Sequence, residues 1–143
     1  MNAPDLPAGY SLAEGSPDAA TYLRLRERAG LGPKRQDQAE AAVRDNWAAV
    51  HAVHDEAGTV GMGRVIGDGG WYFHIVDMAV LPAHQRRGIG DAILTALLDR
   101  IRADAPPGAW VNLLADPPGR RLYARHGFTE TAPDSLGMAL TLD

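Results

Sequence analysis

The sequence contains no cysteine, and this absence excludes several kinds of chemistry together. Disulfide bonds, zinc–thiolate sites and a cysteine nucleophile all require a thiol. No apolar run approaches the roughly 20 residues that a membrane-spanning helix needs. Residues 1–9 also lack the basic flank and apolar centre of a signal peptide. We therefore expect a cytoplasmic protein with no membrane partner and no covalent cysteine intermediate.

Positive charge is also scarce. The chain has 14 Lys and Arg residues against 18 Asp and Glu residues, a formal net charge of −4. Non-specific binding of nucleic acid depends on neutralising phosphates with basic side chains, so nucleic acid is not an expected partner. With 143 residues, of which 45% are hydrophobic, the sequence predicts one domain over residues 1–143 with its own core.

Strand-like and helix-like segments follow one another along the chain. We predict strands at residues 10–13, 47–54, 59–66, 71–81, 109–114, 128–131 and 136–142. We predict helices from Ser16 to Gly30, over 36–46, over 91–102 and from Asp116 to about His126, with Ser16 capping the first. The order is βααβββαβαββ, which predicts an α/β protein with a mixed sheet and helices on its faces.

The most informative segment is Gln85-Arg86-Arg87-Gly88-Ile89-Gly90, which lies between an apolar strand and a long amphipathic helix. A helix N-terminus presents unpaired N–H groups and about half a positive charge, so it favours phosphate. Glycine lets the backbone approach phosphate oxygens closely. The spacing matches neither of the two common nucleotide-binding loops. The segment therefore predicts a different phosphate-bearing ligand.

A second motif, Leu122-Tyr123-Ala124-Arg125-His126-Gly127-Phe128, follows about 35 residues later. With Gln85–Gly90, which matches the pattern Q/R-x-x-G-x-G/A, and with Asp77–Pro82 before it, this motif makes nearly the whole chain resemble the GCN5-related N-acetyltransferase (GNAT) superfamily. The resemblance implies an enzyme that uses acetyl-CoA and needs no metal. It also implies a mostly antiparallel sheet in which strands four and five part beyond a bulge in strand four.

The resemblance further implies where acetyl-CoA binds. The pantetheine arm would lie between strands four and five, and the pyrophosphate would lie on the glycine loop. The residues expected to contact acetyl-CoA are Met78, Ala79, Val80, Gln85, Arg86, Arg87, Gly88, Ile89, Gly90, Asp91, Asp116, Arg120 and Tyr123. The Asp91 side chain is expected to turn away from phosphate while its N–H contributes.

Amine acetylation needs a group to protonate the departing thiolate and a group to deprotonate the ammonium. Tyr123 is the candidate general acid, because a phenol has a pKa near that of a thiol, and the resemblance carries this role to it. His74 is the first candidate base, at a position where relatives carry a glutamate or a histidine. Asp77 is the second candidate, and a water relay without a dedicated base is the third.

Several residues have a structural interpretation beside the functional one. Asp116 replaces the asparagine that many relatives carry, and a helix cap before Pro117 explains it better than a ligand contact. Arg120 and Arg121 either reach CoA phosphates or coat a helix. Three aromatic residues, Trp47, Trp71 and Tyr72, either line an acceptor pocket or pack in the core.

The acceptor is not encoded in a motif. The absence of a strongly charged docking extension favours a small-molecule amine, with a protein N-terminus or lysine as the alternative. A non-catalytic acyl-CoA-binding module and an ATP-dependent transferase are the readings from other classes. Thioester cleavage that depends on an added amine would exclude the binding module. Competition binding of CoA against ATP would decide whether the loop binds ATP. A homodimer is an expectation from the superfamily.

Overall fold

The computed structural model describes residues 5–143, so the first four residues of the predicted domain lie outside it. The strands are β1 (Tyr10–Glu14), β2 (Ala48–His54), β3 (Gly58–Gly67), β4 (Tyr72–Val80) and β5 (Trp110–Asn112). The helices are α1 (Ala19–Arg28), α2 (Gln36–Arg44), α3 (Ile89–Asp104) and α4 (Arg120–Arg125), with one-turn 3-10 helices at η1 (Pro82–His84) and η2 (Pro117–Gly119). The order from the first strand through the last helix is the predicted one.

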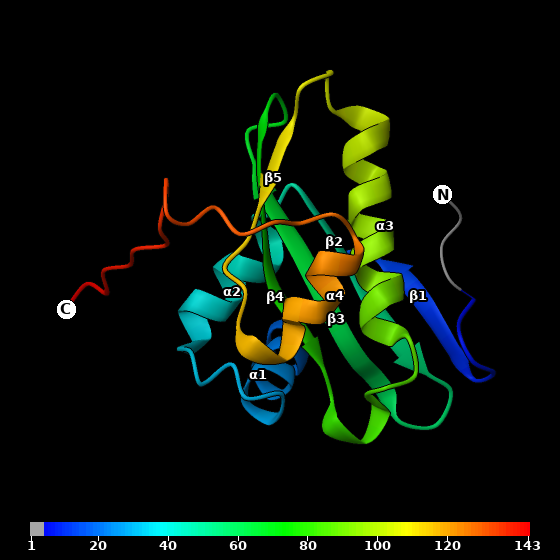
Figure 1. The fold of residues 1–143 in the computed structure, drawn as a ribbon. Helices are drawn as coiled ribbons and strands as arrows, with labels where there is room; N and C mark the ends of the chain where they lie inside the picture. Colours follow the sequence, from blue (N-terminus) through cyan, green and yellow to red (C-terminus); the bar gives the residue numbers. More distant parts are fainter. Residues whose placement is uncertain (1–4) are drawn as a thin grey trace.

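The five strands form one mixed sheet in the order β1-β2-β3-β4-β5 (Figure 1). The first four strands are antiparallel, and β5 pairs parallel to β4. Because a parallel connection must cross over, α3 lies between β4 and β5 in the chain and packs on one face of the sheet. The predicted α/β class with a mostly antiparallel sheet is confirmed.

Two apolar clusters lie on opposite faces of the sheet. The larger one joins the buried face of α3 (Ile93 and Leu97, among others) to residues of β3 and β4 such as Val65 and Phe73. The smaller one joins α1 and α2 to Met62 and Ala79. Helices therefore cover both faces, as the amphipathic patterns predicted.

Close packing of α3 on β3 depends on a glycine. A Cβ built at Gly63 would lie 2.6 Å from the Met78 sulfur and 2.8 Å from Ile93 Cγ2. Real Cβ atoms essentially never come that close, so Gly63 lets the helix sit against the strand.

The start of α1 differs from the prediction. Its N-cap is Asp18, whose carboxylate accepts a hydrogen bond of 2.8 Å from Thr21 N–H. Ser16 was the predicted cap, but its hydroxyl accepts instead from the Asn46 side chain. Asp18 supplies a charged acceptor to the positive end of the helix, and Pro17 precedes the cap rather than following it.

The two strands predicted after α4, at residues 128–131 and 136–142, do not form. The C-terminal segment instead leaves α4 and runs out beyond the sheet (Figure 1). Its alternating apolar side chains are exposed, from 67% at Leu136 to 91% at Met138. The alternation is typical of a strand, but a strand also needs a partner, and this segment pairs with none in the described chain.

Candidate active site

The centre of the site is a bulge in β4. Met62 of β3 pairs with Ala79, whereas Arg64 pairs with Val76. Gly63 alone therefore faces two residues, Asp77 and Met78. Asp77 adopts a left-handed backbone with φ of 58°, which is uncommon for a residue other than glycine. The bulge reverses the strand alternation, so Asp77 lies on the α1 face and Met78 on the α3 face.

Beyond this point β4 and β5 separate. Their pairing covers only three residues of each strand and ends at His74 and Asn112, although β4 continues to Val80. The β5-facing backbone groups of β4 have no strand partner there within residues 5–143. A polar backbone edge in such a gap can pair with an extended ligand as it would with another strand. The separation implied by the superfamily resemblance is present.

The glycine loop meets the N-terminus of α3 at the end of this gap. Gly88 is the N-cap, with φ of 80° and no side chain to satisfy the helix. The first intrahelical bond runs from Ala92 N–H to the Gly88 carbonyl. The N–H groups of Ile89, Gly90 and Asp91 consequently have no hydrogen-bond partner in the described chain.

The space above the loop is open. A Cβ at Gly88 would meet no atom within 4 Å, and one at Gly90 would make only ordinary contacts, of 3.5 Å with Leu122 and 3.8 Å with Val80. The protein itself therefore does not require the small size of Gly90. A ligand phosphate lying on the free N–H groups would require it, so these residues fit the pyrophosphate of CoA.

Gln85 ties the loop to the strand before it. Its side-chain amide donates a hydrogen bond of 2.9 Å to the carbonyl of Val80. Arg86 takes a left-handed conformation with φ of 62°, and the side chains of Arg86 and Arg87 are exposed. The loop therefore presents backbone N–H groups flanked by two exposed cations.

Tyr123 lies on α4, which packs against the cluster on the α3 face. Its ring stacks edge-on with Phe128 at a centroid distance of 6.1 Å, and its hydroxyl makes no hydrogen bond to a described residue. Burial raises the pKa of Tyr123, and the negative charge of Asp116 adds to the increase. The phenol therefore keeps its proton across neutral pH and can donate it.

His74 lies on the opposite, α1 face of β4, and its ring contacts Asn112 across the β4–β5 pair. The distance from His74 Nδ1 to Asn112 Oδ1 is 2.7 Å. The Asn112 amide nitrogen donates to the Phe73 carbonyl at 3.0 Å, which fixes the amide with its oxygen toward the histidine. The neutral imidazole then carries its proton on Nδ1 and leaves the Nε2 lone pair free to accept a proton.

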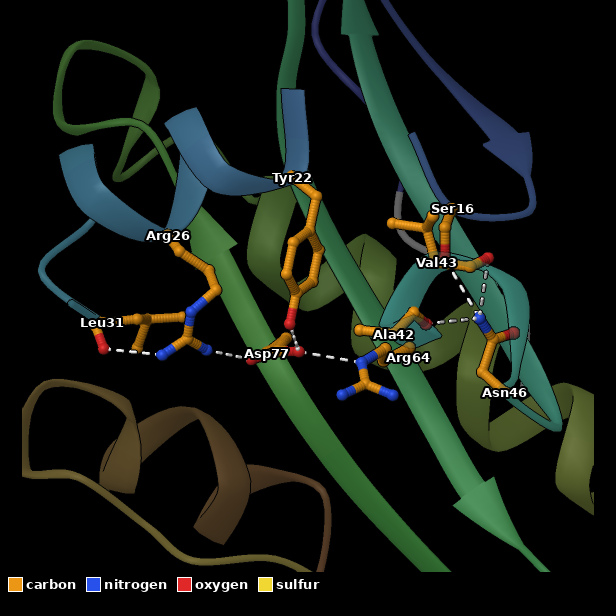
Figure 2. Close-up of polar contacts among 9 residues, drawn as sticks. All are labelled: Ser16, Tyr22, Arg26, Leu31, Ala42, Val43, Asn46, Arg64 and Asp77. Carbon is orange, nitrogen blue, oxygen red and sulfur yellow. Dashed lines mark hydrogen bonds and ion pairs between the residues drawn. The ribbon is translucent and has the colours of Figure 1, made fainter. Parts of the chain in front are cut away.

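Asp77 lies at the centre of a buried ion-pair network, which Figure 2 shows. Its carboxylate accepts hydrogen bonds from the Tyr22 hydroxyl at 2.5 Å, from Arg64 Nε at 2.8 Å and from Arg26 Nη1. Arg26 also donates to the carbonyl of Leu31 at 2.7 Å. Burial and the bond to Asp77 raise the pKa of Tyr22, so this phenol stays a donor.

These contacts occupy the Asp77 carboxylate. Its oxygens already accept from two guanidinium groups and one phenol, which leaves little room for a substrate ammonium. The network instead fixes the bulge and ties it to α1 and to the loop after α1. This arrangement favours His74 over Asp77 as the base.

A family model described as an acetyltransferase (GNAT) domain matches residues 46–130, which is more than half of the chain. The chain belongs to the GNAT acetyltransferase family. It is therefore an acyltransferase, and the predicted superfamily is confirmed.

Solved structures of GNAT enzymes share the fold. A probable acetyltransferase from meticillin-resistant Staphylococcus aureus is 36% identical, with a TM-score of 0.87 over 93% of this chain and 99% of that one. An aminoglycoside acetyltransferase from an uncultured soil sample is 22% identical, with a TM-score of 0.66 over 94% and 99% of the two chains. The Escherichia coli ribosomal-protein-S18-alanine N-acetyltransferase is 17% identical, with a TM-score of 0.71 over 86% and 79%. No curated protein matches.

Of three other residues expected to contact acetyl-CoA, Arg120 and Asp91 have side-chain partners within residues 5–143 and Asp116 has none. Asp116 is the N-cap of η2, with Pro117 at the first position as predicted, but its side chain makes no capping hydrogen bond. Arg120 Nε donates to the carbonyl of Ala115 at 3.0 Å. The carboxylate of Asp91 contacts His126 Nε2 at the end of α4, a contact that the sequence did not indicate.

Two shallow hollows lie outside the gap between β4 and β5. One is between the β1–β2 edge and α3, and the other is between α1 and residues 81–84. The candidate site is the gap where β4 and β5 separate, which we call the open seam. It is not an enclosed cavity. Within residues 5–143, no cluster of three metal-ligating side chains occurs, and no helix has the length and apolar character to cross a bilayer.

Proposed function

We propose that this GNAT enzyme transfers an acetyl group from acetyl-CoA to the primary amine of a small molecule, by direct attack in a ternary complex. The observation that carries the proposal is the open seam beyond the Asp77 bulge, which leads to the free N–H groups of Ile89, Gly90 and Asp91. When bound, acetyl-CoA supplies an activated thioester. The backbone of Met78, Ala79 and Val80 would hold the pantetheine arm, and an N–H among them would polarise the thioester carbonyl.

The residue roles balance the reaction. The amine nitrogen forms a bond to the acetyl carbon, and the carbon–sulfur bond breaks. The free Nε2 of His74 takes the proton that the ammonium must lose, directly or through water. Tyr123 gives its proton to the departing thiolate, and the second proton that the nitrogen loses as the amide forms restores the Tyr123 phenol through water. His74 and Tyr123 lie on opposite faces of the sheet, so the two proton transfers would occur on opposite sides of the reacting carbon.

Release of free thiol from acetyl-CoA tests the proposal. We expect thiol release only when a suitable amine is added, with a matching mass increase of one acetyl group on that amine. Tyr123→Phe should abolish most of this signal and still bind CoA. Thiol release that does not depend on any amine in a broad panel would contradict the transfer reaction.

The acceptor class has one alternative. The aminoglycoside enzyme and the ribosomal-protein enzyme have the same fold, so the fold fits either a small-molecule or a protein acceptor. The sequence contains no strongly basic or acidic run that would dock a protein of opposite charge, which supports the small molecule. Acetylation of peptides in preference to every small amine tested would favour the alternative.

A non-catalytic acyl-CoA-binding module is the candidate from another class. A binding module would not need the fixed His74–Asn112 contact or a Tyr123 hydroxyl without a protein partner. Binding of CoA with no turnover for any acceptor, in wild-type protein, would support that reading.

We also propose that residues 1–143 act as one cytoplasmic domain without nucleic-acid or membrane partners, and that two copies form a homodimer. The exposed, alternating apolar side chains of Leu136, Met138, Leu140 and Leu142 support the dimer, because such a segment is stable when it pairs with a strand. Light scattering should give twice the chain mass, and Leu140→Glu should reduce it to that of one chain.

A further inference from the structure

The Asp77 network contains more positive than negative charge. Two guanidinium groups, from Arg26 and Arg64, share the single carboxylate of Asp77. Their side chains are only 11% and 14% exposed. No other carboxylate in residues 5–143 forms an ion pair with either arginine. The terminal nitrogens of Arg64 are not among the buried atoms without a hydrogen-bond partner, so an anion from solvent can reach them and offset the excess positive charge.

Arg64 is the cation that can receive this anion. The hydrogen bonds of Arg26 hold it in place: Nη1 donates to Asp77 and Nη2 to the Leu31 carbonyl. Arg64 uses only Nε, toward Asp77. Figure 2 shows that its two terminal nitrogens point away from Asp77, and neither has a partner in the described chain. Two parallel N–H donors on one guanidinium edge match the two oxygens of a carboxylate.

The strand register places Arg64 beside the candidate base. Arg64 pairs with Val76, and Ile66 pairs with His74, so these four side chains lie on one face of the sheet. Arg64 and Ile66 are two residues apart, roughly 7 Å along the strand. A small molecule can therefore reach both the Arg64 guanidinium and the His74 imidazole.

The same face continues over β5 with apolar surface. Tyr72 pairs with Trp110, their ring centroids are 5.5 Å apart, and they are 39% and 46% exposed. Ile66 is 44% exposed. One face of the sheet therefore carries the Arg64 guanidinium, then the His74 imidazole, and then the exposed rings of Tyr72 and Trp110.

We infer that the acceptor is an amine that also carries a carboxylate, of the α-amino-acid class, and that Arg64 binds this carboxylate. The carboxylate supplies the second anion, and the amine lies toward His74. The inference rests on the proposed acetyl transfer and adds the acceptor's charge to it. Arg64 is then a specificity-determining residue, held in position by Asp77.

Matched probes test the inference: the proteinogenic α-amino acids, each compared with its amide, as acceptors for the full-length enzyme. The amide keeps the amine and the side chain but loses the negative charge. We expect kcat/KM for the best amino acid to exceed that for its amide by roughly tenfold to a hundredfold, the range for a charge-assisted hydrogen bond. Arg64→Gln should remove this preference, because it should lower kcat/KM for the acid, through KM, far more than kcat/KM for the amide.

A thermal melt and a control variant separate a loss of carboxylate binding from a loss of folding. Arg64→Gln leaves one guanidinium for one carboxylate in the network, so it should fold, and a thermal melt checks this. Arg24→Gln is the matched control, because Arg24 is an exposed arginine of α1 that contacts only the Thr59 carbonyl. It should keep the full preference. Equal use of acids and amides by the wild type, or an equal loss for both with Arg64→Gln, would overturn the inference.

A second experiment distinguishes failure of the proposed acetyl transfer from failure of the Arg64 carboxylate site. If no amine in the panel is acetylated, calorimetry with the N-acetyl amino acids and their amides still reports on Arg64. Tighter binding of the acids, lost with Arg64→Gln, supports the carboxylate site without the reaction. Equal binding of both sets contradicts it.

Discussion

The proposed site has two halves, which we call the donor half and the acceptor half, and they differ in the kind of group that would bind the ligand. The donor half, residues 78–80 and 85–91, consists of backbone N–H and C=O groups on a bulged strand, a glycine loop and a helix N-terminus. The acceptor half consists of side chains from three elements, with Tyr22, Arg26, Arg64 and His74 gathered around Asp77 or beside it. Backbone groups would bind the donor whatever side chains the loop carries, whereas the acceptor that we propose is selected by the charges of particular side chains.

Removing the centre of the acceptor half should have the largest effect. Asp77→Ala leaves two buried guanidinium groups without a counter-charge and the Tyr22 phenol without an acceptor. We expect the free energy of unfolding to fall by about 3–5 kcal/mol, measured by urea denaturation. Asp37→Ala, which breaks an exposed ion pair with Arg35, is the control and should have little effect. Equal losses for the two variants would show that the network does not stabilise the fold.

Tyr123 tests the chemical step between the halves. Tyr123→Phe keeps the ring that packs on Phe128 and removes only the hydroxyl. We expect kcat to fall by roughly a hundredfold or more, the usual size of a general-acid contribution, with the Kd for CoA nearly unchanged. A weaker Kd with unchanged kcat would assign the hydroxyl to binding instead.

The donor half should tolerate side-chain removal but not backbone change. Gly88→Ala forces a Cβ into a left-handed conformation, which should cost about 1–2 kcal/mol of stability and weaken CoA binding. Arg87→Ala keeps the backbone and should weaken CoA only several-fold at low salt. Calorimetric titration with CoA measures both. A larger loss for Arg87→Ala would mean that side chains, not backbone, dominate the donor half.

The orientation of His74 should control how fast the amine loses its proton. In His74→Ala we expect kcat to fall while the Kd for CoA stays nearly unchanged, because the proposed proton acceptor is gone. Asn112→Ala removes the amide that fixes the ring and should lower kcat less. Steady-state thiol release measures both variants, and an unchanged kcat in His74→Ala would leave a water relay as the route for the proton.

The smallest expected effect concerns Asp116. Burial is the main cause of the raised pKa of Tyr123, and the charge of Asp116 is the second cause. Asp116→Asn removes only the second, so the phenolate should form at slightly lower pH. Because Tyr123 must be protonated to act, the high-pH limb of the kcat profile should move slightly downward. A shift upward would exclude this electrostatic coupling.

Much of the donor half could be predicted because its residues are contiguous. Gln85–Gly90 lies between a strand and a helix that periodicity identifies, and local geometry then produces the free N–H groups. The acceptor half could not be predicted in the same way. Asp77 meets Tyr22 and Arg26 across 55 and 51 residues, and His74 meets Asn112 across 38. The sequence singled out Asp77 as a titratable group but contained no sign of its three partners.

The C-terminal segment shows where a local sequence pattern predicts too much structure. Its alternation predicted a strand over 136–142, yet the described segment is exposed and unpaired. A helix satisfies its own backbone, so α3 follows from its pattern, whereas a strand depends on a neighbour that no local pattern supplies.

By itself, the sequence determined the family, the order of elements through α4 and the place of the glycine loop at the start of α3, because these depend on short-range periodicity and on glycines at fixed positions. Only the tertiary structure decided that Asp77 holds two arginines, that Asn112 orients His74 and that Arg64 keeps two donors free. Those properties arise when strands and helices distant in sequence bring polar and charged side chains into contact, and no local sequence pattern specifies such contacts.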